Sequence, residues 1–431
     1  MYFAKKAAAA LLCISTLAFS GGCFLNNALE NARGQLFETI NFDDDSAYTK
    51  IPETESVNSP YYTSNSVISK GYDFLKTESQ KQCYTSIGEA VYKISETANE
   101  FNLYPIGKVT IQDKEFTEKD MELCIKAYSL DHPAVFWLAN RYTYGAAGNQ
   151  FVVQLYSFIS GTDCRTQMIT FNDTVNEIMS SIPNGLNQYH LEKYIHNVIA
   201  DKSVFAEGIS TTDGHWEEFS AYGALVKGSA VCEGYSHAAA LLLNKVGIEC
   251  YYINGFSDSN PHMWNSVKID GNWYHLDITW DDSENAYYHY FNLSDKVIKR
   301  DHVIAERFEN VPNSTTDIYN IFLPKCDSDS ANFFVVESTF IDDFSDCREV
   351  MVNDLIEAGN NHDTEFTVRF DSSIDFNEAI KEMFNAEPYY MFSYMAEANE
   401  QLDDGDKFND ENVSIIMLES FNSVVVKLAY K

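Results

Sequence analysis

Cys232 has the sequence setting of a nucleophile. It follows Gly228 and the small pair Ser229-Ala230, and it opens an apolar helical run that ends near Gly247, a residue well suited to terminate a helix. A helix N-terminus carries unpaired N–H groups and a partial positive charge, and both favour the thiolate over the thiol. The thiolate is the reactive form. Taken alone, Cys232 is equally compatible with a buried structural cysteine at the start of a helix.

Two strands around a tight turn are predicted to carry a base and an acid. Residues 262–269 and 272–280 have strand patterns, and Asp270-Gly271 between them is among the strongest short signals for a β-hairpin. A two-residue turn pairs Ile269 with Asn272, and this pair fixes every other pair in the hairpin.

The predicted register brings His262 and Asp277 to one face of the hairpin. Trp264 is expected opposite Asp277, and His262 opposite Thr279, so all four side chains project to the same side. His262 and Asp277 are then diagonal neighbours, so the carboxylate can hold one ring nitrogen while the other faces a thiol. A structural hydrogen-bonded pair is the alternative interpretation.

Three blocks of sequence resemble the transglutaminase-like superfamily, which shares the papain-like cysteine fold. They lie within residues 190–302 or so and read SAYGALVKGSAVCEGYSHAAALLLNKVGI, HMWNSVKIDGNWYHLDITWDD and YFNLSDKVIKRDH. A looser resemblance, in LDHPAVFWLANRYTYG, is to exported bacterial members. The resemblance implies a triad in which Cys232 is the nucleophile, His262 the base and Asp277 the acid, and it implies acyl transfer through a thioester.

The resemblance also implies donors that stabilise an oxyanion. The backbone N–H of Cys232 is a reasonable donor, and Tyr222 and Trp264 are candidates for the second, although both also fit as core aromatics. Glu233 is a candidate contact for a substrate amine, but complementing the helix dipole explains it equally well. His237 is interpreted as a packed or surface histidine.

Composition and spacing argue against several classes of partner. The chain has 30 basic and 64 acidic residues and a formal net charge of -34, so nucleic acid and anionic membrane surfaces are not expected partners. The sequence has no CxxC pair, no His/Cys cluster with zinc spacing, and no EF-hand spacing around Asp281-Asp282. We therefore expect neither a metal nor a cofactor. The sequence leaves the oligomeric state open.

The first residues have the pattern of an export signal. Two lysines precede a mostly apolar run over residues 7–19, which is too short to span a bilayer. Ser20-Gly21-Gly22 before Cys23 resembles a bacterial lipobox, although Ser20 replaces the usual leucine. We expect a signal peptide over residues 1–22 and a lipid anchor at Cys23 on the cell surface, with plain secretion or a retained anchor as alternatives.

The remaining patterns divide the chain and predict an α+β fold class. After the signal segment we expect a tether over 23–60, an N-terminal mostly helical region over 61–165, a transglutaminase-like core over 166–310 and a small C-terminal α+β domain over 311–431. In the core, a helix bearing the nucleophile is expected to pack on an antiparallel sheet. Helices are predicted over 86–101, 118–128, 174–182, 191–200, 347–358 and 376–384, and strands over 152–158, 250–256, 333–337, 365–370, 414–418 and 423–428.

These features together predict an exported cysteine enzyme that attacks amide bonds of proteins or cell-wall peptides. Water as the acceptor gives hydrolysis by a peptidase, whereas a lysine or another amine gives cross-linking by a transglutaminase-type acyltransferase. The alternative is a non-catalytic surface module that retains the transglutaminase-like fold for binding.

Overall fold

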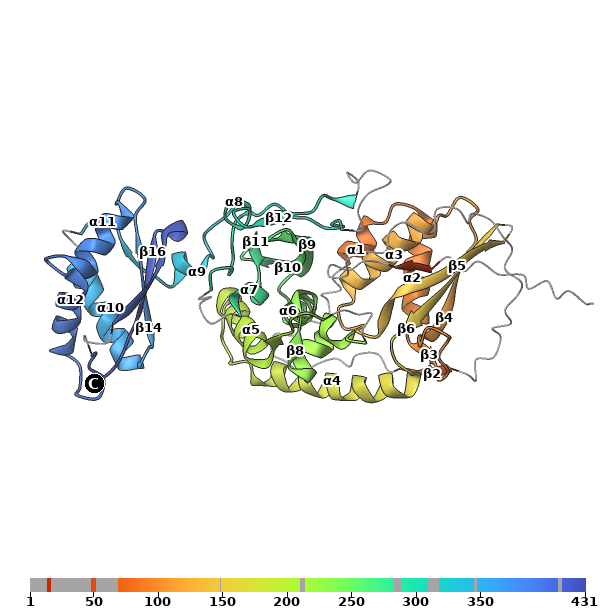
Figure 1. The fold of residues 1–431 in the computed structure, drawn as a ribbon, viewed down its shortest axis with the longest axis horizontal. Helices are drawn as coiled ribbons and strands as arrows, with labels where there is room; N and C mark the ends of the chain where they lie inside the picture. Colours follow the sequence, from red (N-terminus) through yellow and green to blue (C-terminus); the bar gives the residue numbers. More distant parts are fainter. Residues whose placement is uncertain are drawn as a thin grey trace, which may run out of the picture. The chain divides into compact units, whose positions relative to one another are not determined.

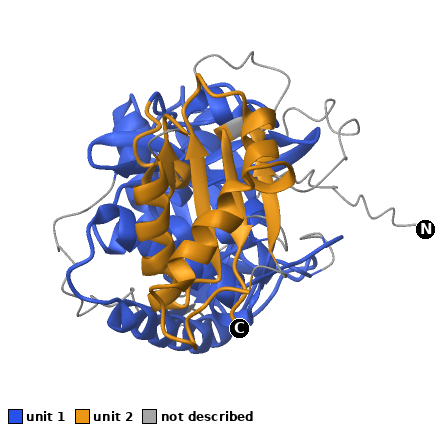
Figure 2. Ribbon diagram, turned by 90° about the vertical axis from the view of Figure 1, so that its left-hand side faces the viewer, with its two compact units in different colours: residues 1–327 blue, residues 328–431 orange. Residues whose placement is uncertain are grey.

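The chain divides into two compact units. The computed structural model describes residues 14–16, 48–51, 69–147, 149–209, 214–282, 288–308, 318–344, 347–409 and 413–431. Unit 1 comprises residues 1–327 and unit 2 residues 328–431 (Figure 2). The sequence patterns predict the start of the C-terminal domain at residue 311, before the boundary between the two units. Most of the expected signal segment and tether, including Cys23, lies outside the described residues.

The N-terminal part of unit 1 contains a sheet as well as helices. The strand order is β1-β5-β6-β4-β3-β2. The strands are β1 (Ile14–Thr16), β2 (Tyr48–Lys50), β3 (Lys93–Ser95), β4 (Tyr104–Ile111), β5 (Leu138–Ala147) and β6 (Gln150–Ser157), and the helices are α1 (Lys70–Phe74), α2 (Glu78–Ala90) and α3 (Glu118–Asp131) (Figure 1). The region over residues 61–165, expected to be mixed with mostly helices, thus contains more strands than the one predicted over residues 152–158.

The helix predicted over residues 86–101 lies too late in the sequence. Thr77 starts α2 with a capping box, in which its side chain accepts from the N–H of Gln80 while the Gln80 side chain accepts from the N–H of Thr77. The helix ends at Ala90. Ile94, whose spacing suggested a helix, is instead a fully buried residue of β3.

The second part of unit 1 is a helix-and-sheet core. Its helices are α4 (Gly161–Ser181), α5 (Gln188–Lys202), α6 (Cys232–Lys245), α7 (Ile278–Asp281) and α8 (Asp295–Ile298), with short helical turns η3 (Glu217–Phe219) and η4 (Gly223–Lys227). Its sheet has the antiparallel order β11-β10-β9-β12, made of β9 (Cys250–Ser257), β10 (Asn260–Ile269), β11 (Asn272–Leu276) and β12 (His302–Ile304), and β7 (Val204–Phe205) pairs separately with β8 (Ser229–Ala230). Helix α6 packs on β9 and β10, as the sequence predicts.

The hairpin turn is confirmed, but its second strand is shorter than predicted. Ile269 pairs with Asn272, and both turn residues between them have positive φ, as a tight hairpin turn requires. The ladder ends at Leu276. Asp277 then caps α7, because its carboxylate accepts the N–H of Trp280. Thr279 therefore lies in a helix, and the expected pairing of Thr279 with His262 is wrong.

Unit 2 is a small α+β fold with its own hydrophobic core. Its sheet has the order β13-β14-β16-β15, made of β13 (Thr339–Ile341), β14 (Glu365–Phe370), β15 (Ser414–Leu418) and β16 (Ser423–Lys427). Its helices are α9 (Phe333–Val336), α10 (Arg348–Asn361), α11 (Phe376–Ile380) and α12 (Tyr390–Asn399), with the turns η6 (Lys381–Asn385) and η8 (Glu419–Phe421). The predicted strand over residues 333–337 is wrong, because the Asn332 side chain caps a helical turn there. None of the helices in the described part of the chain is both long and apolar enough to cross a bilayer.

Candidate active site

Cys232 is the first residue of α6, and the N-terminus of this helix is held by close backbone contacts. Val231 precedes it as the N-cap, and its N–H donates to the carbonyl of Glu218 at 2.9 Å. A Cβ at Gly234 would lie 2.6 Å from that same carbonyl oxygen, so the close approach requires glycine. Val231 has no side-chain acceptor, so no N-cap side chain takes up the N–H groups of the first turn.

Polar side chains fix α6 against the sheet that carries His262. The Asn265 amide on β10 donates to the carbonyl of Ser236 on α6 at 3.0 Å. At the other end of the helix, the Asn244 side chain makes two 2.8 Å hydrogen bonds to the backbone of Cys250. These bonds set the register between the helix that presents the sulfur and the strand that presents the imidazole.

His262 lies between Asp277 and Cys232. Its Nε2 is 2.6 Å from Oδ2 of Asp277, and both side chains are buried. Cys232 also lies close enough to His262 to contribute to raising the pKa of its ring. Because Nε2 serves the carboxylate, Nδ1 is the nitrogen left to exchange a proton with the thiol.

The buried pair titrates as an imidazolium and a carboxylate. Burial by itself lowers the pKa of His262, but the charge and hydrogen bond of Asp277, with further contributions from Cys232, outweigh it and raise the pKa to about 10. Burial alone would likewise raise the pKa of Asp277, yet His262 and a second histidine, His302, hold it well below its usual range. Each partner thus keeps the other charged in a buried environment.

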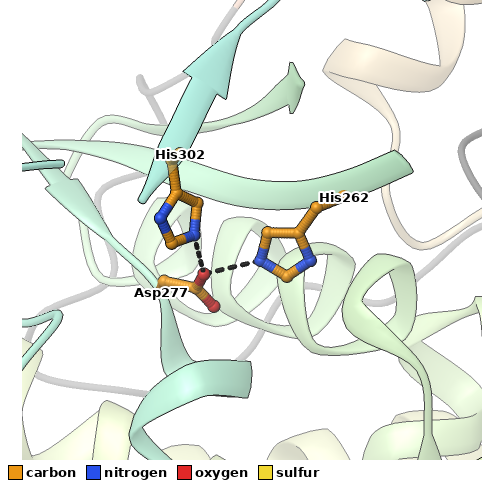
Figure 3. A group of neighbouring side chains, drawn as sticks. All are labelled: His262, Asp277 and His302. Atoms are coloured by element: carbon orange, nitrogen blue, oxygen red, sulfur yellow. Dashed lines mark hydrogen bonds and ion pairs between the residues drawn. The ribbon is translucent and has the colours of Figure 1, made fainter. Parts of the chain in front are cut away.

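The second histidine is the feature that the sequence reasoning missed. Figure 3 shows the rings of His262 and His302 pointing at the same oxygen of Asp277, with His302 Nε2 at 3.1 Å from Oδ2. His302 is buried and begins β12. Its only sequence signal is the final letter of the block YFNLSDKVIKRDH, to which no role was assigned.

The other predicted contacts of the site have different surroundings. Trp264 stacks on His262 at 5.8 Å between ring centroids, but its N–H donates to Nδ1 of His275 at 3.0 Å, so this N–H is not available to an oxyanion. Tyr222 is buried and stacks on Phe136 at 4.8 Å, which matches the alternative of a core aromatic.

Glu233 and His237 form a separate buried pair. Oε1 of Glu233 lies 3.8 Å from Nε2 of His237, one turn further along α6. Burial raises the pKa of Glu233, against the opposing effect of His237. The ring of His237 packs edge-on against Tyr252 of β9. Glu233 therefore faces a neighbouring histidine of its own helix.

Two clusters among the described residues gather side chains of the kinds that bind metals. In the first, His262 Nε2 and Asp277 Oδ2 are 2.6 Å apart, whereas two ligands of a tetrahedral zinc ion lie about 3.3 Å apart. In the second, burial lowers the pKa of His275, and Nδ1 accepts from Trp264, so the single proton lies on Nε2 and points to Asp295 at 2.9 Å. We interpret both clusters as hydrogen-bonded networks.

The described residues thus place a thiol at the N-terminus of α6, a histidine on β10 of the adjoining antiparallel sheet, and an aspartate that follows β11 and caps α7. Residues 176–278 match the sequence family described as the transglutaminase-like superfamily. This segment therefore forms a transglutaminase-like domain with an α+β fold.

Three solved structures are similar to this chain over part of its length. One is described as a TGase, with 13% identity, a TM-score of 0.27, and coverage of 50% of this chain and 63% of that one. A candidate protease from Parabacteroides distasonis has 9% identity, a TM-score of 0.21, and coverage of 31% and 35%. A candidate cysteine protease from Cytophaga hutchinsonii has 13% identity, a TM-score of 0.21, and coverage of 43% and 70%. The chain thus spans less than two thirds of the first two, and no curated protein matches it.

Proposed function

We propose that the chain is a cysteine acyl-transfer enzyme whose catalytic residues are Cys232, His262 and Asp277. The observation that carries this proposal is the buried ring of His262, which is hydrogen-bonded to Asp277 at 2.6 Å and whose pKa is raised by Cys232 as well as by Asp277. A buried ion pair of this kind adds little stability over apolar packing, so chemistry is the stronger reason for it.

The arrangement supports a two-step reaction at an amide bond. In the resting site His262 is already the imidazolium and holds the proton that Cys232 has given up, so the thiolate sulfur attacks the carbonyl carbon directly. The tetrahedral intermediate collapses when His262 returns the proton to the leaving amine, which leaves a thioester on Cys232. Water or a second amine then attacks the thioester, His262 takes its proton, and the sulfur leaves. Asp277 keeps the ring oriented and balances the imidazolium charge throughout.

The first turn of α6 is the best support for an oxyanion site. The backbone N–H of Cys232 lies in that turn, next to Val231, whose side chain cannot cap the helix. A negative oxygen in this position gains from the N–H and from the partial positive charge of the helix end. Since the N–H of Trp264 is engaged with His275, a second donor must come from elsewhere.

The substrate and location extend the proposal. We propose that the enzyme is exported, is held at the cell surface by a lipid at Cys23, and acts on proteins or cell-wall peptides. The export pattern of residues 1–22 supports this location. Incubating the full chain with a peptide library, with and without an added alkylamine, separates the reactions by mass: cleavage, deamidation and cross-linking each give a different product.

An electrophilic thiol probe tests the mechanism before any substrate is known. We expect the Cys232 peptide to label fastest, and Cys232→Ser and His262→Asn to abolish this labelling. Cys347→Ser, which removes a buried cysteine of unit 2, is the matched control and should leave it unchanged. Labelling at Cys232 that is independent of His262 would point to the rival, a non-catalytic binding module.

A further inference from the structure

His302 reaches the candidate site from β12, the edge strand of the sheet that lies beyond β9. Its strand β12 pairs with β9, where His302 lies opposite Ser257, and β9 separates it from His262 on β10. Gly255 of β9 pairs with both His262 and Ile304, and it adds no side chain to the face between the two histidines. The two imidazoles are 5.3 Å apart between ring centroids.

Both ring nitrogens of His302 face carboxylate oxygens. Nε2 lies 3.1 Å from Oδ2 of Asp277, and Nδ1 lies 2.5 Å from Oδ1 of Asp301. An ionised carboxylate only accepts hydrogen bonds, and a neutral imidazole has only one N–H to give. Both contacts are satisfied together when His302 carries a proton on each nitrogen, as an imidazolium.

The titratable groups around this imidazolium balance its charge. Asp277 and Asp301 contact its two nitrogens, the rings of His262 and Tyr290 pack beside it, and His275 lies close enough to respond to its charge. The Tyr290 hydroxyl donates to Asp301 at 2.8 Å and so holds this outer carboxylate in place. The carboxylates of Asp277 and Asp301 therefore face the two imidazole rings. Asp277 and both rings are buried.

We propose that His302 is a positioning residue that keeps Asp277 ionised and directed at His262 throughout the reaction. The inference rests on the proposed function, since it concerns the support of the same base. Each time His262 hands its proton to the leaving amine, it becomes neutral, and Asp277 would be left as an isolated buried charge. His302 supplies a positive charge at that moment, while the N–H of Trp280 holds the other carboxylate oxygen at 3.2 Å.

Two substitutions at His302 separate its charge from its hydrogen bond. In the full chain, the rate of iodoacetamide labelling at the Cys232 peptide is measured from pH 4 to pH 9 or so. His302→Phe removes both properties, and it should slow labelling at neutral pH by about tenfold and move the acid limb of the profile up by about one pH unit. His302→Gln retains a donor without the charge, so it should recover most of the rate but keep the shifted limb.

A control and a direct measurement complete the test. His132→Phe removes a histidine of the N-terminal part that stacks on Tyr128, and it should change neither the rate nor the profile. In protein labelled with ¹⁵N-histidine, His302 should show a proton on both ring nitrogens at pH 7 and should lose one in Asp301→Asn. This spectrum needs no folded His302 variant.

The outcomes distinguish this inference from the proposed function. A His302→Phe variant with the wild-type pH profile, or a His302 ring with one proton, overturns the positioning role while His262-dependent labelling still stands. A lower melting temperature with an unchanged profile would assign His302 to sheet stability alone. Wild-type labelling that does not require His262 would instead remove the proposed function itself.

Discussion

Glu192 of α5 is a buried acid whose protonation should control the stability of unit 1. Its side chain is fully buried, and its Oε2 accepts from the amide of Asn292 at 2.7 Å. Its Oε1 and the Oδ1 of Asn292 have no hydrogen-bond partner among the described residues. A protonated Glu192 offers an O–H that can satisfy an acceptor of this kind. Burial, opposed by the Asn292 bond, raises the pKa of Glu192 to about 8.

The sign of the pH dependence follows from the direction of this shift. Because the folded protein binds the proton more tightly than the unfolded chain does, this contribution to stability is fully present below about pH 4.5 and is lost as the pH rises through 8. Glu192→Gln keeps the shape and supplies a permanent N–H donor. Relative to wild type, the variant should therefore gain about 1 kcal/mol at pH 5 and about 4 kcal/mol at pH 8.

Urea unfolding followed by tryptophan fluorescence measures this difference. All five tryptophans lie within residues 1–327, so the signal reports on unit 1 alone. Glu249→Gln is the matched control: Lys268 and Lys70 outweigh burial and lower the pKa of Glu249, so this variant should be slightly less stable than wild type at pH 8. If the gain of Glu192→Gln is the same at pH 5 and pH 8, the reasoning about its ionisation fails.

The remaining predictions concern the site and its support. Cys232→Ser should abolish thiol-probe labelling and peptide turnover while leaving the melting temperature within about 2 °C, because the side chains are nearly isosteric; a variant as active as the parent contradicts the mechanism. Asp277→Asn should slow labelling or turnover by roughly 10⁴-fold, as expected when a base loses its orienting acid, and a loss below tenfold would remove Asp277 from that role. Gly255→Ala places a Cβ 2.6 Å from the Trp264 ring and 2.3 Å from a backbone oxygen. It should destabilise unit 1 by about 1–3 kcal/mol in the urea assay, whereas Gly405→Ala, which meets nothing within 4 Å, should be neutral.

The sequence predicts those parts of the site that depend on local pattern. The Asp-Gly turn sets the pairing of Ile269 with Asn272, and a two-residue period then places His262 on the same face of the hairpin as Trp264, on which its ring stacks. Cys232 begins α6 as expected because an apolar run with helical spacing follows small, turn-forming residues. Each of these features is encoded within about 15 neighbouring residues, where geometry is nearly fixed by the chain itself.

The parts that sequence reasoning misses depend on competition between local choices or on distant contacts. An aspartate such as Asp277 is compatible both with the end of a strand and with the cap of a helix. In this chain it caps α7, because its carboxylate accepts a hydrogen bond from the Trp280 N–H. His302 lies 25 residues beyond Asp277, and only the pairing of β12 with β9 brings it back to the site. The periodicity of a single strand carries no information about which distant strand lies next to it.

Two buried carboxyl groups of unit 1 show why burial alone does not reveal function. Glu192 faces one neutral amide, so burial raises its pKa and favours the uncharged acid, which suits a structural pair. Asp277 is equally buried, but its pKa moves down, because two imidazoles and a backbone N–H surround it. Ionic groups are seldom retained in a core for stability, since apolar residues of the same volume serve as well. The carboxylate that stays charged, against the trend set by burial, is thus the one whose charge the chain has a chemical reason to keep.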